Sequence, residues 1–477
     1  MAASREQFGS RLGFVLAAAG SAVGIGNLVG FPVNAAKNGG GAFLLMYAIF
    51  VFTICVPVMM AELAAGRNSA KGPLGAYASL TNNNKFWSIA GWLSTITPFM
   101  IAVFYTVITV WIFEYLYNAL TGDLAELAKP ETFGSFINGG NIFIHLAVVI
   151  GIVNLILVGG VKEGIERSAK ILMPALFLML IGMVIFVLTQ ENAMAGVKFY
   201  LIPDFSKLTG PVVSGALGQA FFSLSLGMGI LITYGSYMDK QSSIASSAKM
   251  VAIADTSVAF FAGLMILPAI FSFNPQTDPT ELSDSSVSLI FSFLPKIFLA
   301  LQGSIGYFGA SVVASVFFLL VFFAALTSLV SIIEVPAASL VDQKGYSRKK
   351  SLLVLNLGMI LFTIACTASF GMVGWLTEFV VYSGANKSLF DVVYDVFYDT
   401  ILPLNGLLIC LFVIYRWQKH NLDAELETGD DGFKGSFLER YMHFSLGTFI
   451  PVILALIFIN TVAIKFFGAS LLASIGF

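Results

Sequence analysis

The chain consists mainly of long apolar runs separated by short polar connections. A membrane-spanning helix needs about 20 mainly apolar residues, and this pattern predicts about eleven spans. The predicted spans are 12–35, 41–66, 88–119, 142–159, 168–189, 212–237, 248–273, 301–340, 350–370, 389–416 and 442–467. The connection Asn274–Ser304 holds an apolar stretch that is too short to span and is broken by Pro295. We expect a helical hairpin there, dipping into an outer vestibule.

The composition is that of a membrane protein. Of 477 residues, 57% are hydrophobic and 11% are charged, whereas soluble domains carry about 25% charged residues. We expect one membrane transport domain over 1–477, in contact with the lipid bilayer. The net charge of −2 and the lack of a basic patch give no indication of nucleic-acid binding. Cys55, Cys366 and Cys410 lie in apolar runs and are expected to be buried thiols.

Basic residues gather before the first predicted span and after every second span. They are Arg5, Arg11, Arg67, Lys71, Lys85, Lys162, Arg167, Lys170, Lys240, Lys249, Lys344, Arg348, Lys349, Lys350, Arg416 and Lys419. The positive-inside rule therefore predicts a cytoplasmic amino terminus. An odd number of spans then places the carboxyl terminus outside. We expect the protein to lie in the inner (plasma) membrane of the cell.

The first span contains a stretch that is poorly suited to a simple helix. Gly20–Pro32 reads GSAVGIGNLVGFP, and a second such stretch, Ser223–Gly229, reads SLSLGMG in the sixth span. Backbone that unwinds at membrane depth must face protein or a water-filled cavity. The alternative is that the glycines only allow close helix packing. Two interrupted spans in corresponding halves favour a transporter's binding site.

These two breaks divide the chain into repeats. Spans 1–5 (12–189) and spans 6–10 (212–416) form two halves, and an odd number of spans in each makes the second half inverted. The eleventh span (442–467) lies outside the repeat.

Oxygen-bearing side chains cluster in and near the broken spans. A hard cation such as sodium prefers oxygen ligands. The alternative for a membrane hydroxyl is a bond back to its own helix. The candidates are Ser21, Asn27, Gln219, Ser223, Ser225, Thr327, Ser328 and Ser331.

Carboxylates inside the predicted spans are costly unless they are paired. They are Glu62, Asp255, Glu334, Asp391, Asp395 and Asp399. For Asp255 we favour an ion site over simple bonding to neighbouring hydroxyls. For the triplet at 391, 395 and 399, a solvated helix start is expected for two of the three.

Several enzyme classes have no support in the sequence. His145, His420 and His443 lack the spacing of a zinc site, and no nucleophile or phosphate-binding motif occurs. Tyr105, in the third span, would by itself be interpreted as an interfacial anchor. We therefore expect a protein that is not an enzyme and has no organic cofactor.

Four segments of the chain resemble one known family. The segments 11–43, 57–67, 219–237 and 322–331 include RLGFVLAAAGSAVGIGNLVGFP and QAFFSLSLGMGILITYGSY. Through them the chain resembles bacterial members of the neurotransmitter:sodium symporter family, whose structural prototype is the leucine transporter LeuT. The resemblance implies an all-α polytopic fold, a LeuT-like 5+5 inverted repeat with broken helices 1 and 6. It also implies sodium-coupled amino acid uptake by alternating access.

The resemblance assigns roles to individual residues of this chain. The first sodium site would use Ala22, Asn27, Ser223 and Asp255. The second would use Gly20, Val23, Ala324, Thr327 and Ser328. The substrate pocket would be lined by Ala22, Gly26, Ile101, Tyr105, Phe222, Ser225, Met228, Ser328 and Ile332. Tyr105 would bind the substrate carboxylate and Phe222 would be the outer lid. The inner gate would pair Arg5 with Asp342 near Ser236 and Tyr237.

Two further positions bear on the substrate and on chloride. Gly24 stands where monoamine transporters of the family carry an aspartate, which implies a substrate with its own carboxylate. Asp255 stands where chloride-dependent members have a neutral residue. A fixed negative charge can balance sodium, so we expect that chloride is not required.

Three residues depart from the family pattern. Gly30 replaces the arginine of the outer salt bridge, so that arginine cannot pair with Asp395. Asp395 then finds another cation, or the gate depends on Phe222 and packing alone, or the space admits a larger or cationic substrate. Phe8 replaces a tryptophan of the inner latch, and Met228 replaces an aromatic residue of the pocket.

The favoured function is a sodium-coupled symporter that imports a small zwitterion, which we expect to be an amino acid. The alternative is a membrane sensor that binds an amino acid with sodium without transporting it. An intramembrane enzyme is disfavoured. A monomer or weak homodimer is expected.

Overall fold

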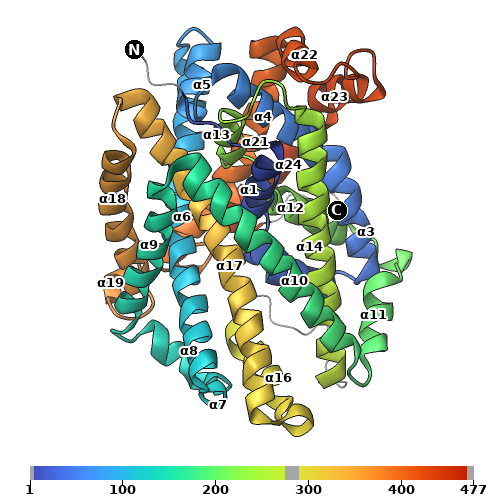
Figure 1. Ribbon diagram of the computed structural model, residues 1–477, viewed down its shortest axis with the longest axis vertical. Coiled ribbons are helices and arrows are strands. Elements are labelled where there is room, and N and C mark those ends of the chain that lie inside the picture. Colours follow the sequence, from blue (N-terminus) through green and yellow to red (C-terminus); the bar gives the residue numbers. More distant parts are fainter. Residues whose placement is uncertain (1–4, 274–288, 470–477) are drawn as a thin grey trace.

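The computed structural model describes residues 5–273 and 289–469, and nearly all of its regular structure is helical (Figure 1). Its first half contains α1 (Arg11–Ala22), η1 (Gly26–Gly30), α2 (Phe31–Lys37), α3 (Gly41–Phe50), η2 (Val51–Cys55), α4 (Val56–Ser69), α5 (Pro73–Leu80), α6 (Lys85–Thr121), α7 (Leu124–Leu127), α8 (Pro130–Ile137), α9 (Ile142–Val158), η3 (Val161–Glu166), α10 (Arg167–Leu188), α11 (Ala193–Leu201) and η4 (Phe205–Lys207).

The second half begins at the other broken span. It contains α12 (Gly210–Ser223), α13 (Ile230–Gly235), α14 (Ile244–Phe273), η6 (Leu289–Phe293), α16 (Leu294–Ala300), α17 (Gln302–Lys344), α18 (Arg348–Ala368), α19 (Gly374–Thr377), β1 (Val380–Tyr382), β2 (Ala385–Lys387), α20 (Leu389–Val393), η7 (Tyr394–Ile401), α21 (Leu402–Leu411), η8 (Phe412–Gln418), α22 (Lys419–Glu427), α23 (Phe437–Gly447) and α24 (Phe449–Phe467). Except for the 3₁₀ turn η4, the η segments are π-helical.

The described residues contain the predicted spans. Eight helices are long and apolar enough to cross a membrane, and α1 with η1–α2 forms a further span bent by 55°. The 17-residue α9 and the interrupted pair α12–α13 complete the set of eleven. The fifth span begins at Val161, earlier than the expected 168, and the tenth continues to Glu427. Both extensions carry charged side chains, which can reach toward the membrane surface from a helix end.

The helices form a bundle with two distinct ends (Figure 1). One end, here called the amino-terminal face, carries α5, α22 and α23, and the opposite face carries α7, α8 and α16. Helices α6 and α17 pack along each other in the interior. The apolar part of α17 is 83% buried, against 17% for α23–α24. The last span therefore lies at the periphery, where α24 packs on α21 and η7.

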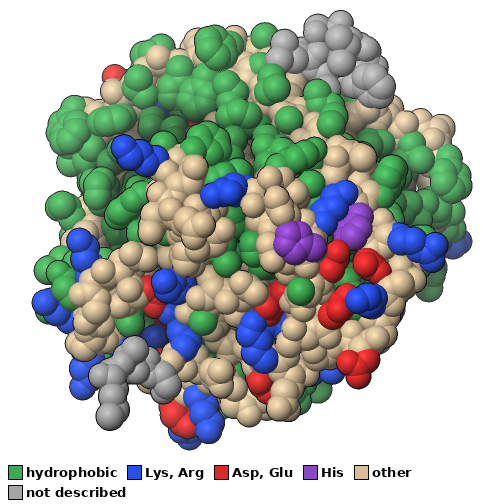
Figure 2. Space-filling model, turned by 90° about the horizontal axis from the view of Figure 1, so that it is seen from above, with side chains coloured by type: hydrophobic (Ala, Val, Ile, Leu, Met, Phe, Trp, Pro, Cys, Tyr) green, Lys and Arg blue, Asp and Glu red, His purple; other side chains and the backbone are tan. Residues whose placement is uncertain are grey.

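Charged side chains gather on the amino-terminal face. Figure 2 shows this face, with basic, acidic and histidine side chains over its middle and hydrophobic side chains around much of the edge. Ion pairs there include the buried pair of Arg67 with Glu425 and the pair of the half-buried Arg348 with Glu334. Large apolar side chains are exposed along the bundle, for example Leu155 and Phe308 at 80% and 82%, as expected for surfaces that face lipid.

Local sequence sets several helix ends. The side chain of Asn84 accepts from the backbone N–H groups of Phe86 and Trp87 and so caps α6. Ser347 caps α18 in the same way. Gly345 ends α17 with a φ of 63°, a conformation that glycine adopts without strain.

Two features modify the sequence-based picture. The antiparallel pair β1–β2 is a short exception to the all-helical expectation, with Val381 opposite Asn386. In the expected hairpin at Asn274–Ser304, residues 274–288 lie outside the described residues. The part that is described, 289–300, forms η6 and α16 and packs against α17.

Candidate functional site

The first span is interrupted between Ala22 and Gly26. Val23 leaves the helix with an extended ψ of 106°. The N–H of Gly24 then donates to Asn27 Oδ1 at 3.1 Å, and that of Ile25 to the Tyr105 hydroxyl at 3.4 Å. Gly26 is exposed although it lies mid-span, and a Cβ there would meet nothing within 4 Å. At Gly26 the break therefore faces open space, whereas Gly24 allows close packing, because a Cβ there would lie 2.8 Å from the Tyr105 hydroxyl.

The sixth span is interrupted between Ser223 and Ile230. Ser225, Gly227 and Gly229 adopt positive φ values of 54°, 76° and 70°. A Cβ on Gly227 would lie 2.5 Å from the carbonyl oxygen of Leu402, so only glycine allows this close approach of the tenth span. The Gly227 N–H donates to Glu62 Oε1 at 2.7 Å, which ties the break to the second span.

The two breaks lie against each other and against α17. The hydroxyls of Ser225 and Ser328 each donate to the carbonyl oxygen of Ser21, both at 3.1 Å. Three spans that are distant in sequence thus meet at one backbone oxygen.

A cavity of about 720 Å³ opens beside this junction. It is lined by all nine residues expected to contact substrate, and it extends past Gly30, Asn34, Gly215 and Gln219. The deep part has apolar walls from Ile101, Met228 and Ile332. Its polar groups are the Tyr105 hydroxyl, the hydroxyls of Ser225 and Ser328, and the backbone of the first break.

Three of the four residues expected at the first sodium site form one buried cluster. Asp255 is fully buried. Its Oδ1 accepts from Asn27 Nδ2 at 2.7 Å, and its Oδ2 accepts from the Ser223 hydroxyl at 2.8 Å. The fourth, Ala22, lines the adjoining cavity. This geometry fits an ion site at Asp255 and also simple bonding of Asp255 to neighbouring hydroxyls, because the same side-chain oxygens that bond to Asp255 are possible ligands of an ion.

Tyr47 is a member of this cluster that the sequence analysis missed. Its hydroxyl lies 3.0 Å from both Asp255 Oδ2 and Ser223 Oγ, and the side chain is fully buried. The only signal in the sequence is a single hydroxyl within the apolar run Gly41–Phe50.

The residues expected at the second sodium site are brought together less uniformly. Ser328 Oγ lies 3.5 Å from the carbonyl oxygen of Gly20 and 3.2 Å from that of Val23. Thr327 Oγ1 instead donates to Phe323 and Ala324 of its own helix, as in the alternative considered for membrane hydroxyls. Thr327 still packs close to Gly20, because a Cβ on that glycine would lie 3.4 Å from the threonine Cβ.

The expected inner-gate residues meet at the amino-terminal face. Arg5 forms an ion pair with Asp342, and its Nη2 donates to the Ser236 hydroxyl at 2.6 Å. The guanidinium lies 4.6 Å from the ring centre of Tyr237. Phe8 packs edge-on against Tyr237, in place of the larger tryptophan. The cavity is therefore closed toward this face.

The opposite end of the cavity differs from the family pattern. Asp395, which has no arginine at position 30 to pair with, accepts from Lys465 Nζ at 2.9 Å and from the Tyr382 hydroxyl at 2.8 Å. Lys465 also contacts Asp399 at 2.6 Å. The structure thus confirms the first of the three alternatives, another cation for Asp395.

This pairing corrects the interpretation of the carboxylate triplet. A solvated helix start was expected for two of the three. Only Asp391 has that role, in a capping box with Ser388. Asp395 and Asp399 are instead 6% and 15% exposed in their side chains and are held by Lys465. The prediction failed because the compensating cation comes from the last span, which the local pattern does not reveal.

The remaining carboxylates within the spans have partners as well. Glu334 is fully buried and accepts from Arg348 and from the Tyr237 hydroxyl. Glu62 accepts from Gly227, while its second oxygen has no partner among the described residues. All three cysteines are free and buried, as predicted.

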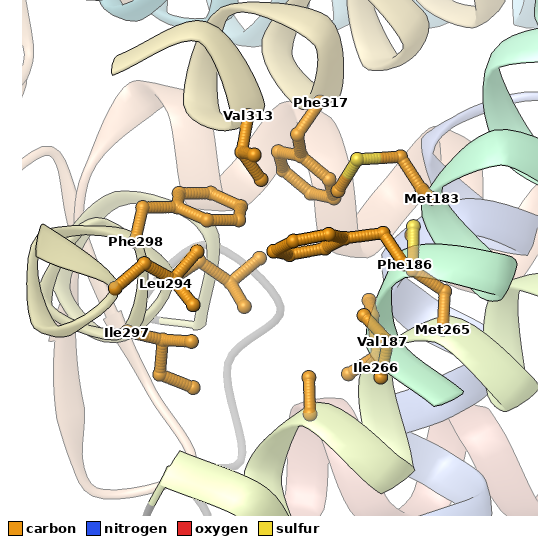
Figure 3. Close-up of a pocket in the computed structure, with 12 residues that line it drawn as sticks. Met183, Phe186, Val187, Met265, Ile266, Leu294, Ile297, Phe298, Val313 and Phe317 are labelled. Carbon is orange, nitrogen blue, oxygen red and sulfur yellow. The ribbon is translucent and has the colours of Figure 1, made fainter. Parts of the chain in front are cut away.

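Two other features are separate from this cavity. Asp423, Glu439 and His443, on α22 and α23, bring potential metal-ligand atoms within 4.8 Å of one another, which sequence spacing did not suggest. Figure 3 shows an apolar pocket of about 20 Å³ between α10, α14, α16 and α17, where Phe186, Phe298 and Phe317 converge. The described residues that line this pocket offer no polar side chain for a zwitterion.

The chain is similar in sequence to a family of membrane transporters. A model of the Sodium:neurotransmitter symporter family matches residues 5–129 and 126–467. An uncharacterised sodium-dependent transporter of Bacillus subtilis (strain 168), YhdH, is 34% identical over 472 residues, covering 97% of this chain and 98% of its own length. The sodium- and chloride-dependent GABA transporter 2 of Rattus norvegicus is 27% identical over 408 residues, covering 76% of this chain and 66% of its own length.

A solved structure agrees with the fold. The crystal structure of MhsT in complex with L-phenylalanine superimposes with a TM-score of 0.82 at 37% identity, over 96% of this chain and 99% of that chain. This likeness confirms the predicted LeuT-like architecture. These similar proteins are transporters and not enzymes, in agreement with the expectation from the sequence.

Proposed function

The chain belongs to the sodium:neurotransmitter symporter family and is a sodium-coupled membrane transporter, and we propose that it imports a zwitterionic amino acid with an apolar side chain. The alternating-access cycle, the two sodium sites and the independence from chloride are parts of the same proposal.

One observation carries the proposal: a single cavity joins both helix breaks to an apolar pocket. Tyr105 and the backbone of the first break offer hydrogen bonds to a carboxylate at one end. Ile101, Phe222, Met228 and Ile332 offer apolar contacts at the other. Methionine adapts to varied shapes, so a bulky apolar side chain suits this pocket. The L-phenylalanine complex of MhsT supports the same substrate class.

Sodium binding is supported by the oxygen atoms beside that cavity. At the first site, a cation would compensate the buried carboxylate of Asp255, whose neighbours Asn27, Ser223 and Tyr47 carry no charge. At the second, Ser328 and the carbonyl oxygens of Gly20 and Val23 offer hard ligands. Because Asp255 supplies a fixed negative charge, a bound chloride is not needed for balance.

The closed and open ends of the cavity indicate which conformation of the transport cycle this structure represents. The Arg5–Asp342 pair closes the amino-terminal face, while the cavity continues from the exposed Gly26 past Gly30 and Asn34. We assign the amino-terminal face to the cytoplasm, because Lys and Arg gather there. The conformation is then outward-open, and it becomes inward-open when the Arg5–Asp342 contact breaks.

The test is uptake into proteoliposomes with an inward sodium gradient, with a panel of radiolabelled amino acids in chloride and in gluconate. We expect sodium-dependent accumulation of one or more apolar amino acids in both anions. Accumulation only in chloride would refute the role of Asp255. Binding without accumulation would show a sensor, and no response to any α-amino acid would refute the substrate class.

A further inference from the structure

The two carboxylates beside the open end of the cavity share one lysine from the last span. Lys465 Nζ of α24 lies 2.9 Å from Asp395 Oδ1 and 2.6 Å from Asp399 Oδ2. Asp395 is also bonded by the Tyr382 hydroxyl at 2.8 Å, and Lys387 lies at 3.7 Å. The side chains of Asp395 and Asp399 are 6% and 15% exposed, so their charges depend on these partners.

The lysine is placed differently from an arginine at position 30. Gly30 lines the cavity, so a cation there would connect the first span to the tenth across the opening. Lys465 and Lys387 are not among the residues that line the cavity. The ion pairs of Asp395 and Asp399 therefore join the tenth span to its outer neighbours, and they do not cross the space through which substrate enters.

The carboxylates also flank, in the sequence, a tyrosine that stacks on Phe222, the expected outer lid. Tyr398 lies between them in sequence and stacks on Phe222, with ring centres 5.0 Å apart and planes at 24°. It also contacts Tyr394 at 4.9 Å, and both tyrosines line the cavity. This stretch is the π-helical segment η7, in which the Thr400 hydroxyl donates to the Asp395 carbonyl oxygen at 2.7 Å. An external anchor therefore helps to fix where Tyr398 points.

We propose that Lys465 is a positioning residue of the outer gate, which anchors η7 so that Tyr398 covers Phe222. This role rests on the transport function proposed above. The eleventh span, which lies outside the inverted repeat, is thereby part of the gate. This outer gate has no ion pair across the cavity, and it depends instead on the stacking of Tyr398 on Phe222, which Lys465 stabilises from the side away from the cavity.

The test compares Lys465→Gln with two controls in the proteoliposome assay. Lys465→Arg keeps the charge, and Lys387→Gln removes a lysine from the same carboxylate at the longer distance. The substrate is L-phenylalanine in the first instance, or another amino acid that the panel identifies. We expect Lys465→Gln to raise KM about tenfold with kcat changed less than twofold, as fits the loss of one partly exposed ion pair. Both controls should stay within about threefold of wild type.

Lys465→Gln alone leaves two poorly exposed carboxylates without their cation, which could unfold the protein, so a second variant removes those charges as well. The combination of Lys465→Gln, Asp395→Asn and Asp399→Asn removes all three charges, and it should still show the raised KM because η7 has lost its anchor. A wild-type KM in Lys465→Gln or in this combination, or failure of Lys465→Arg to restore it, would overturn the proposal. Failure of wild-type uptake would instead refute the proposed function.

Discussion

The hydroxyl of Tyr47 provides the sharpest test of the proposed first sodium site. Replacing Tyr47 by Phe removes a single oxygen from a fully buried side chain. That oxygen lies 3.0 Å from Asp255 Oδ2, where it is one of the donors to the only charged group in the cluster that also contains Asn27 and Ser223. We expect the variant to bind sodium more weakly while keeping its fold.

The Tyr47 hydroxyl favours the ionised form of Asp255, which is the form that would bind sodium, so the magnitude follows from the kind of hydrogen bond that is lost. A hydrogen bond to a charged group contributes about 1.5–3 kcal/mol, and about 1.4 kcal/mol corresponds to a tenfold change in affinity. Asn27 and Ser223 still donate to the carboxylate in the variant, so the smaller value applies. The sodium concentration for half-maximal uptake should therefore rise about tenfold.

Tyr200→Phe is the matched control. Tyr200 is also fully buried and lies near Phe31, as Tyr47 does, but its hydroxyl donates to the neutral carbonyl oxygen of Phe260 at 3.1 Å. This control should lose some thermal stability and leave the sodium dependence unchanged. A sodium titration of uptake, with melting temperatures in detergent, separates the two effects. A Tyr47→Phe protein that melts normally and responds to sodium like wild type would refute the assignment.

Three further changes test other parts of the site. Gly24→Ala should reduce uptake severalfold, because its Cβ would lie 2.8 Å from the Tyr105 hydroxyl and overpacking costs about 1–3 kcal/mol; KM and kcat measurements check this. Gly30→Arg should change KM and substrate range, and unchanged uptake kinetics would show that this position does not set them. Arg5→Ala should favour the inward-open form by removing the partner of Asp342. Labelling of a cysteine introduced by Ser225→Cys into the cavity should then increase from the cytoplasmic side, and unchanged labelling would contradict the gate.

Much of the fold could be predicted because its determinants are local. Hydrophobic length marks the spans, and glycine with proline at membrane depth marks the first break. The inner gate was predicted from resemblance, since Arg5 and Asp342 are 337 residues apart. The all-helical expectation missed β1–β2, a hairpin of three-residue strands whose pattern is too short to stand out.

The contacts that could not be predicted join residues on helices that are distant in the sequence and adjacent only in the folded protein. Tyr47 and Asp255 are 208 residues apart, and a tyrosine in an apolar run gives no sign of a buried carboxylate beside it. Asp395 and Lys465 are 70 residues apart and lie on spans that the repeat does not relate. Spacing showed that 391, 395 and 399 share a face, but only packing of α24 on η7 shows which of them is buried.

The carbonyl oxygen of Ser21 links the two breaks to each other and to the eighth span. It accepts from Ser225 of the sixth span and from Ser328 of the eighth, so the first span is held at its break by two hydroxyls. Each net hydrogen bond of this kind contributes only about 1 kcal/mol, which a change of conformation can readily offset. A sodium ion among Ser328 and the carbonyl oxygens of Gly20 and Val23 would add a stronger link between the first and eighth spans. Its departure would leave only the weak bonds, and release of the first span would then open the amino-terminal face.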